Sequence, residues 1–128
     1  MFKELETKRL LIRRFSLEDW EAIHAYSTDP VEKKHDIQDK EVSKELAIEF
    51  SKSPYYWAIY VKSSNSVVGH ILLTENFSLV WSIGCVLNQK FLKQKYSKEA
   101  YIAIINYLFI EKKHTELNLS VIMGTLML

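Results

Sequence analysis

One stretch of the chain, residues 79–109, carries most of the information about the fold. It reads LVWSIGCVL (79–87), NQKFLKQKY (88–96) and SKEAYIAIINYLF (97–109). The first part is apolar and rich in β-formers, the second is polar, and the third has the apolar spacing of a broad buried helix face. We therefore expect a strand, a short loop and a helix that continues to about Lys113.

The loop in this stretch is also a candidate anion site. A strand that leads through a short loop into a helix presents free backbone N–H groups and the positive end of the helix dipole, and both suit phosphate. Junctions of this kind are common, however, and most of them bind nothing. On the residues alone, the loop is therefore a candidate and no more.

Two further helices are expected in the first half of the chain. Ser16, followed three residues later by Asp19, forms a capping box that predicts a helix from there to about Ser27. A second helix is expected from about Asp39 to Lys52, because apolar residues recur along it every four positions. Those residues, which we expect on its inner face, are Val42, Leu46 and Phe50.

Five runs predict strands, namely residues 9–15, 56–61, 67–73, 79–87 and 117–121. The second and third runs are joined by a short polar segment and predict an antiparallel hairpin, which the fourth continues. Gly84 in the fourth run suggests a bulge or a close backbone approach. The last run can return beside the fourth only by a right-handed crossover. The expected fold is α/β (α+β) with a mixed sheet, in the order β-α-α-β-β-β-α-β.

The composition of the chain indicates a folded protein and argues against several classes of function. The 128 residues are 48% hydrophobic and 26% charged, which predicts one globular domain over residues 1–128. A net charge of +1 argues against general attraction to nucleic acid or to a membrane surface. A single cysteine and a charged N-terminus, without an apolar signal segment, predict a cytoplasmic protein. The four histidines, His24, His35, His70 and His114, show no metal-ligand spacing.

Several motifs, taken in order, resemble the GNAT superfamily of N-acetyltransferases, in its ribosomal-protein-alanine-acetyltransferase-like branch. The opening of the chain resembles the start of that branch, and later segments match its third strand, fourth strand and the flanks of its cofactor loop. The opening segments are residues 5–13, 17–20 and 28–30, and the later ones are 67–71, 81–88, 90–91 and 96–100. Each motif is weak alone, but their ordered coincidence over most of the chain is specific.

The resemblance implies a cosubstrate, acetyl-coenzyme A, and direct acetyl transfer to a primary amine of a small molecule or a protein N-terminus. The pantetheine arm would lie along the strand edge near Ile83 to Leu87, and the pyrophosphate would rest on the loop that ends at Tyr96. The tetrahedral intermediate would be stabilised by a backbone N–H. The implied cofactor-binding residues are Ile83, Cys85, Val86, Leu87, Lys93, Gln94, Lys95, Tyr96 and Ser97.

The chain departs from the family pattern in its cofactor loop and in its strand chemistry. Lys93 and Lys95 stand where the family has glycines, and a left-handed conformation costs a residue with a side chain roughly 1–2 kcal/mol. Their charges could recover part of this by binding phosphate, or residues 93–95 could be a solvated loop. Ser82 stands where many relatives carry a carboxylate base, and a serine is no base at neutral pH without activation.

No catalytic residue is assigned from the sequence. His70 and Glu75 could replace the missing base by residue type only, and Cys85 stands where relatives often carry tyrosine. A lone strand histidine is usually an ordinary packed residue, and a buried cysteine is usually inert.

The end of the chain is a third departure. Family members continue past the fifth strand with a helix and two more strands, so the resemblance predicts a domain that is incomplete at its C-terminus. The last strand would then be an exposed edge, open to homodimer formation or a partner strand. The alternative to an active enzyme is a non-catalytic GNAT-like remnant or binding module. A small nucleic-acid-binding domain is disfavoured by the near-neutral charge.

Overall fold

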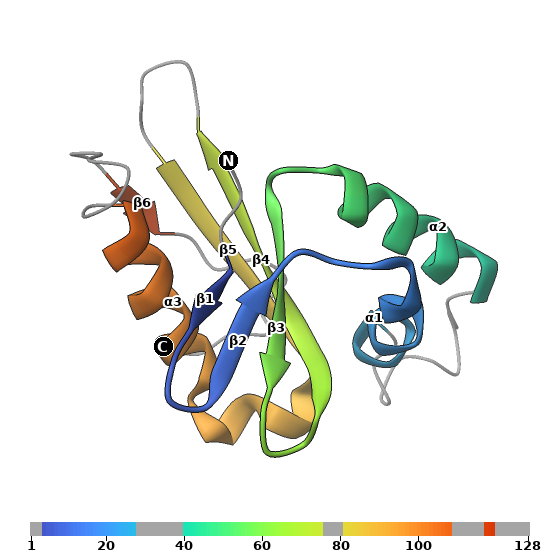
Figure 1. Cartoon of the computed structure of the whole chain (residues 1–128), viewed down its shortest axis with the longest axis horizontal. Helices are drawn as coiled ribbons and strands as arrows, with labels where there is room; N and C mark the ends of the chain where they lie inside the picture. Colours follow the sequence, from blue (N-terminus) through green and yellow to red (C-terminus); the bar gives the residue numbers. More distant parts are fainter. Residues whose placement is uncertain (1–3, 28–39, 76–80, 109–116, 120–128) are drawn as a thin grey trace.

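The computed structural model describes residues 4–27, 40–75, 81–108 and 117–119, and in this part of the chain six strands form one sheet (Figure 1). The strands are β1 (Leu5–Glu6), β2 (Leu10–Arg13), β3 (Tyr56–Val61), β4 (Ser66–Glu75), β5 (Trp81–Leu87) and β6 (Leu117–Leu119). They lie in sequence order, antiparallel except for the parallel pair β5 and β6. The expected mixed sheet, its central meander and the return of the last strand beside β5 are confirmed.

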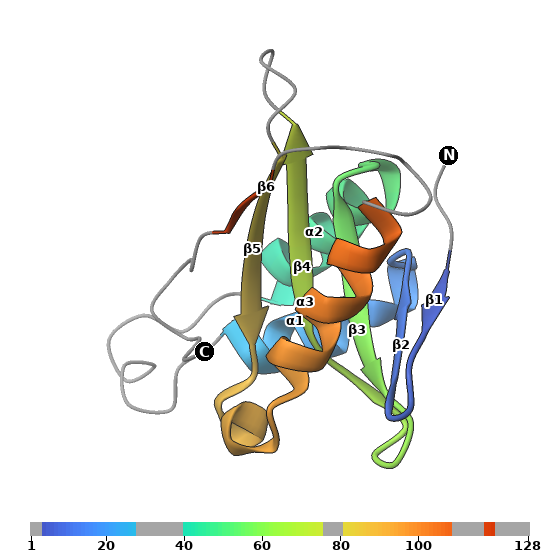
Figure 2. The same ribbon diagram turned by 90° about the vertical axis from the view of Figure 1, so that its left-hand side faces the viewer.

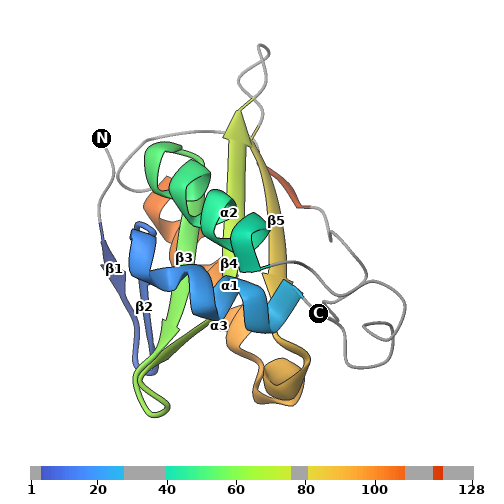
Figure 3. The same cartoon turned by 90° about the vertical axis from the view of Figure 1, so that its right-hand side faces the viewer.

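Helices cover both faces of this sheet. On one face lie the short 3-10 helix η1 (Leu17–Asp19), α1 (Trp20–Ser27) and α2 (Lys40–Lys52), and on the other lies α3 (Tyr96–Asn106) (Figures 2 and 3). Each face has its own core. The core between α3 and the sheet includes Ile12, Ile59, Ile71, Ile83 and Ile104. The core between the sheet and α1 and α2 consists of Phe15, Ile23, Ala47, Phe50, Ala58 and Val67. No helix of the described residues is long and apolar enough to cross a membrane.

The N-terminal segment forms a hairpin that the sequence did not predict. A single strand over residues 9–15 was expected, but the structure has the pair β1 and β2. The turn between them is closed by Thr7, whose N–H donates to the Leu10 carbonyl at 2.9 Å and whose hydroxyl accepts from the Leu10 N–H at 2.9 Å. Because a side chain closes this turn and β1 has only two residues, no period-2 pattern marks it.

The first predicted helix begins where the capping box placed it. The Ser16 N–H donates to the Asp19 carboxylate at 2.8 Å, and Arg13 binds both oxygens of that carboxylate at 3.0 Å. The helix starts as η1 and continues as α1 to Ser27, as predicted. Asp19 therefore holds the end of β2 against the start of α1.

The predicted inner face of α2 is confirmed at Phe50 and in part at Leu46, which is half-buried against the same core, but it is wrong at Val42. Val42 was expected inside but is 42% exposed, and the buried residues are Ser43, Ala47 and Phe50. Ser43 is buried because its hydroxyl lies 2.9 Å from His24 Nδ1 on α1. A hydrogen-bonded serine and a small alanine form the packed face, and a pattern based on large apolar residues misses them.

The β4–β5 ladder is regular, and the bulge expected at Gly84 is absent from it. Gly84 pairs with Leu72, and the register shift lies instead between Ile59 and Tyr60, in the β3–β4 pair. A close backbone approach is found at Gly69 in β4, which lies opposite Leu87. The backbones of β4 and β5 are therefore very close at Gly69 and Leu87, where β5 ends.

Candidate functional site

The segment that follows β5 is built as a second 3-10 helix, η2 (Gln89–Gln94), where the sequence predicted a loop. The Asn88 side chain caps it by accepting from the Lys90 N–H at 3.0 Å, and the Phe91 N–H donates to the Asn88 carbonyl at 2.9 Å. One residue, Lys95, then separates η2 from α3, which begins at Tyr96 rather than at Ser97. The predicted continuation of this helix to Lys113 enters residues outside the described ones.

This junction leaves the beginning of α3 open. The first N–H groups of a helix have no carbonyl partner within it, and here they belong to Tyr96, Ser97 and Lys98. The next one, of Glu99, donates to the Lys95 carbonyl at 3.3 Å, and the Lys95 side chain makes no capping hydrogen bond. The positive end of the helix dipole therefore faces the turn that comes from β5.

Of the two lysines at the family's glycine positions, Lys95 alone adopts the left-handed conformation. Its φ and ψ are 61° and 28°, whereas Lys93 lies within η2 and has no positive φ. Asn65 is the other non-glycine residue with a positive φ among those described. The cost of roughly 1–2 kcal/mol that the sequence suggested at two positions therefore applies at Lys95 only.

Lys95→Gly should therefore raise the free energy of unfolding by about 0.5–1 kcal/mol, because the relief of the left-handed strain exceeds the added chain entropy of glycine. Lys93→Gly is the matched control and should lower it by about 0.5–1 kcal/mol, since glycine is unfavourable within a helical segment. Urea denaturation of both variants measures the difference. Equal effects of the two substitutions would contradict this account of the turn.

The edge of β5 is paired for only part of its length. Its partner β6 pairs with Trp81, Ser82 and Ile83, and no described strand pairs with residues 84–87 on that side. The side chains of Ile83, Cys85 and Leu87 are buried beneath α3, so only their backbone groups face this edge. An extended ligand could add here through backbone hydrogen bonds, in the manner of an extra strand.

The predicted cofactor residues thus fall into two groups. In β5, Cys85, Val86 and Leu87 lie where the strand edge has no described partner, whereas Ile83 pairs with Leu119 of β6. Val86 is half-buried, on the opposite face of the strand from Cys85. Of the remainder, Lys93, Gln94 and Lys95 are exposed, whereas Tyr96 and Ser97 are buried at the start of α3. These residues follow one another along the chain, from the edge of β5 through the turn at Lys95 to the first residues of α3.

Cys85 is unsuited to nucleophilic chemistry. Its thiol is free and buried, and burial raises its pKa to about 12. Thiols act as nucleophiles in the thiolate form, which this site suppresses at neutral pH.

His70 lies on the face of β4 covered by α1 and α2, in a box of aromatic rings. Its Nδ1 lies 2.7 Å from the Tyr26 hydroxyl, and the rings of Phe15, Tyr26, Phe50 and Tyr56 lie 5.2–6.0 Å from it. Burial lowers the pKa of His70 to about 4. The imidazole is therefore neutral at physiological pH and a weak base.

The other two candidates for the base are less informative. Ser82 pairs with Thr74 across the β4–β5 ladder and is half-buried. Glu75 ends β4 opposite Trp81, but its side chain lies outside the described part. Within the described residues, no three histidine, cysteine or acidic side chains are grouped as a metal site.

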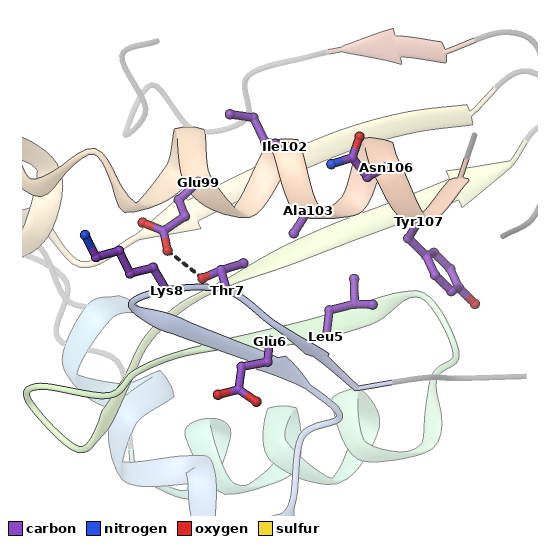
Figure 4. Close-up of a pocket in the computed structure, with 9 residues that line it drawn as sticks. All are labelled: Leu5, Glu6, Thr7, Lys8, Glu99, Ile102, Ala103, Asn106 and Tyr107. Atoms are coloured by element: carbon purple, nitrogen blue, oxygen red, sulfur yellow. Dashed lines mark hydrogen bonds between the residues drawn. The ribbon is translucent and has the colours of Figure 1, made fainter. Parts of the chain in front are cut away.

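Sequence reasoning missed the residues that join the β1–β2 turn to α3. A cavity of about 440 Å³ lies between them, lined by Leu5, Glu6, Thr7, Lys8, Glu99, Ile102, Ala103, Asn106 and Tyr107 (Figure 4). At one end of it, the Thr7 hydroxyl donates to the Glu99 carboxylate at 2.5 Å. Thr7 and Glu99 are 92 positions apart, and no local pattern in the sequence relates them.

Comparisons with known proteins bear on the family of this chain. The profile of the acetyltransferase (GNAT) domain matches residues 9–125. An uncharacterised N-acetyltransferase, YnaD of Bacillus subtilis (strain 168), is 30% identical over 113 residues, which are 84% of this chain and 66% of that protein. An acetyltransferase (GNAT family) structure from Bacillus anthracis is 28% identical, with a TM-score of 0.79 over 91% of this chain and 72% of its own.

Two more distant structures share the fold. A candidate ribosomal-protein-serine acetyltransferase from Vibrio cholerae has a TM-score of 0.76 at 17% identity, over 91% of this chain and 72% of its own. A spermidine N-acetyltransferase SpeG chimera from Vibrio cholerae and hSSAT has a TM-score of 0.66 at 11% identity, over 88% of this chain and 70% of its own. At these identities the likeness concerns the fold alone.

Proposed function

The chain belongs to the acetyltransferase (GNAT) family, and on that premise we propose that it moves an acetyl group from acetyl-coenzyme A to a primary amine. The observation that carries this proposal is the junction after β5, where a strand edge without a partner among the described residues, a left-handed turn at Lys95 and the N-terminal turn of α3 follow one another. This order matches the parts of the donor, a strand-like pantetheine arm followed by a diphosphate.

The residues of this junction have distinct roles in the proposal. The first N–H groups of α3 would bind the diphosphate, helped by the exposed ammonium groups of Lys93 and Lys95. The backbone of residues 84–87 would pair with the pantetheine amides. Bound in this way, the donor would present its thioester to the amine: the new N–C bond would form as the C–S bond breaks, and the proton lost by the attacking nitrogen would go to the departing sulfur, which leaves as the thiol.

The chemistry requires an amine without its proton. Ser82 is not a base at neutral pH, and the pKa of His70, lowered by burial to about 4, leaves it a weak one. The acceptor would therefore lose its proton to solvent, or to a group outside the described residues, before it attacks. Spermidine and a ribosomal protein are named for the two distant structures, so a polyamine and a protein N-terminus are the acceptors to test first.

A binding module without turnover is the second candidate function. The features that favour it are Ser82 at the position of the family's carboxylate and the strain of the left-handed Lys95. In that case the junction would hold the coenzyme, but acetyl transfer to any amine would not exceed the uncatalysed rate.

Thermal unfolding with increasing acetyl-coenzyme A tests both candidates. A ligand at a hundred times its Kd stabilises the folded state by about 2.7 kcal/mol, so binding should raise the melting temperature in a saturable manner. Release of free coenzyme A thiol in the presence of spermidine or an N-terminal peptide then separates enzyme from binding module. No stabilisation at millimolar acetyl-coenzyme A would refute both.

A further inference from the structure

The first turn of α3 is tied to the β1–β2 turn through the carboxylate of Glu99. One of its oxygens accepts from the Thr7 hydroxyl at 2.5 Å and from the Arg9 backbone N–H at 2.9 Å. The other accepts from Arg9 Nε at 2.7 Å. Figure 4 shows the Glu99 side chain directed from α3 toward the turn. The carboxylate therefore has two neutral donors and one cation around it.

Arg9 contacts the start of α3 at a second point. Its guanidinium carbon lies 4.6 Å from the centre of the Tyr96 ring, and Tyr96 is the first residue of the helix. The Arg9 side chain is 41% exposed, whereas that of Glu99 is 19% exposed. A positive charge with access to solvent thus lies against the helix end that the proposed function assigns to phosphate.

Glu99 by itself would oppose phosphate binding. Burial alone would raise its pKa, but the hydrogen bonds from Thr7 and Arg9 outweigh burial and lower the pKa, so the carboxylate is charged at neutral pH. It is the fourth residue of α3, one helical turn or less from the N–H groups of Tyr96, Ser97 and Lys98. That separation is shorter than the screening length of roughly 8–10 Å at physiological ionic strength.

We infer that Arg9 is a charge-balancing residue for the donor's diphosphate: it neutralises Glu99 beside the first turn of α3. The inference rests on the proposed function, because it assigns a role at the same phosphate site. Thr7 and the Arg9 backbone would keep the carboxylate in place without the guanidinium. The Arg9 side chain is therefore needed mainly for its charge.

The hairpin offers a matched control on its other side. Lys62 Nζ binds the Glu6 carboxylate at 2.5 Å and the Thr7 carbonyl at 2.8 Å, and its side chain is 37% exposed. In Figure 4 the Glu6 side chain points away from α3. Lys62, which follows β3, is thus the cation of Glu6 as Arg9 is the cation of Glu99, and Lys62→Gln removes one positive charge beside the same hairpin without uncovering the Glu99 carboxylate.

Isothermal titration calorimetry with coenzyme A at low and high salt tests the inference. Arg9→Gln should weaken binding by about five- to tenfold at low salt, and Glu99→Gln should not weaken it. Arg9→Gln/Glu99→Gln, Arg9→Lys and Lys62→Gln should all bind within about twofold of the unaltered protein. The Arg9→Gln defect should shrink at about 0.5 M salt, which loss of packing alone would not produce.

Each outcome supports or overturns the inference. An unaltered protein that binds no coenzyme A overturns the proposed function and this inference together. Binding by the unaltered protein with equal affinity in Arg9→Gln overturns this inference alone. A double variant as weak as Arg9→Gln, or a weak Arg9→Lys, shows that Arg9 acts through packing and not through charge, and Arg9→Lys gives this answer even if Arg9→Gln does not fold.

Discussion

Gly69→Ala should lower the free energy of unfolding by about 3 kcal/mol, because no space exists for a methyl group at this position. A Cβ atom there would lie 2.1 Å from the Val86 carbonyl oxygen and 2.9 Å from the Leu87 Cα. Both are backbone atoms of β5 and cannot rotate away as a side chain could. The substitution would have to separate β4 from β5 where Gly69 pairs with Leu87. Urea denaturation of the two proteins measures the loss.

A second substitution distinguishes a backbone clash from crowding among side chains. The side-chain atom nearest to that Cβ is Leu87 Cδ1, at 3.1 Å. If the obstacle is main chain, Gly69→Ala should cost as much stability in a Leu87→Ala background as in the unaltered protein, since the Val86 carbonyl remains where it was. A smaller cost in the Leu87→Ala background would show that side chains cause the crowding. The site is relevant to function because Leu87 ends the strand edge proposed to bind pantetheine.

The parts of the fold that the sequence predicted well are those with a regular apolar pattern. The β3–β4 hairpin, the strand β5 and the helix α3 are each long enough for their periodicity to appear. The failures have local physical causes. Val42 was wrongly placed on the inner face of α2, because the next residue, Ser43, is buried there instead and hydrogen-bonds to His24. Strand β1 was missed because the Thr7 side chain closes the turn that follows it.

The candidate site divides in the same way. The junction between β5 and α3 could be predicted, because a strand, a polar segment and a helix are consecutive in sequence. The family resemblance indicated two positions, Lys93 and Lys95, at which a left-handed backbone could occur. The structure shows that conformation at Lys95 and not at Lys93. Contacts between distant segments could not be predicted: Arg9 and Glu99 are 90 positions apart, and Tyr26 and His70 are 44 apart.

Lowering the pH from 7 to 4.5 should cost the protein about 2–3 kcal/mol of stability through His70 alone. The folded-state pKa of His70 is lowered to about 4 by burial, against an ordinary value of 6.5. Between pH 6.5 and about 4, His70 therefore binds a proton in the unfolded chain but not in the folded protein. Protonation of His70 therefore favours the unfolded state. The stability of the folded protein is unaffected by His70 above pH 6.5 and falls progressively down to about pH 4.

His70→Gln isolates this contribution. Glutamine retains a hydrogen-bonding side chain near the Tyr26 hydroxyl but does not titrate, so its stability should fall less steeply than that of the unaltered protein between pH 6.5 and 4. Glu99 and Glu6, whose pKa values are lowered by their hydrogen-bond partners, also lose stabilisation as the pH falls, but they do so in both proteins and cancel in the difference. Urea denaturation at several pH values gives the two slopes, and parallel curves would show that His70 titrates normally. A smaller slope for His70→Gln would also establish that burial in the aromatic box keeps the imidazole uncharged at neutral pH.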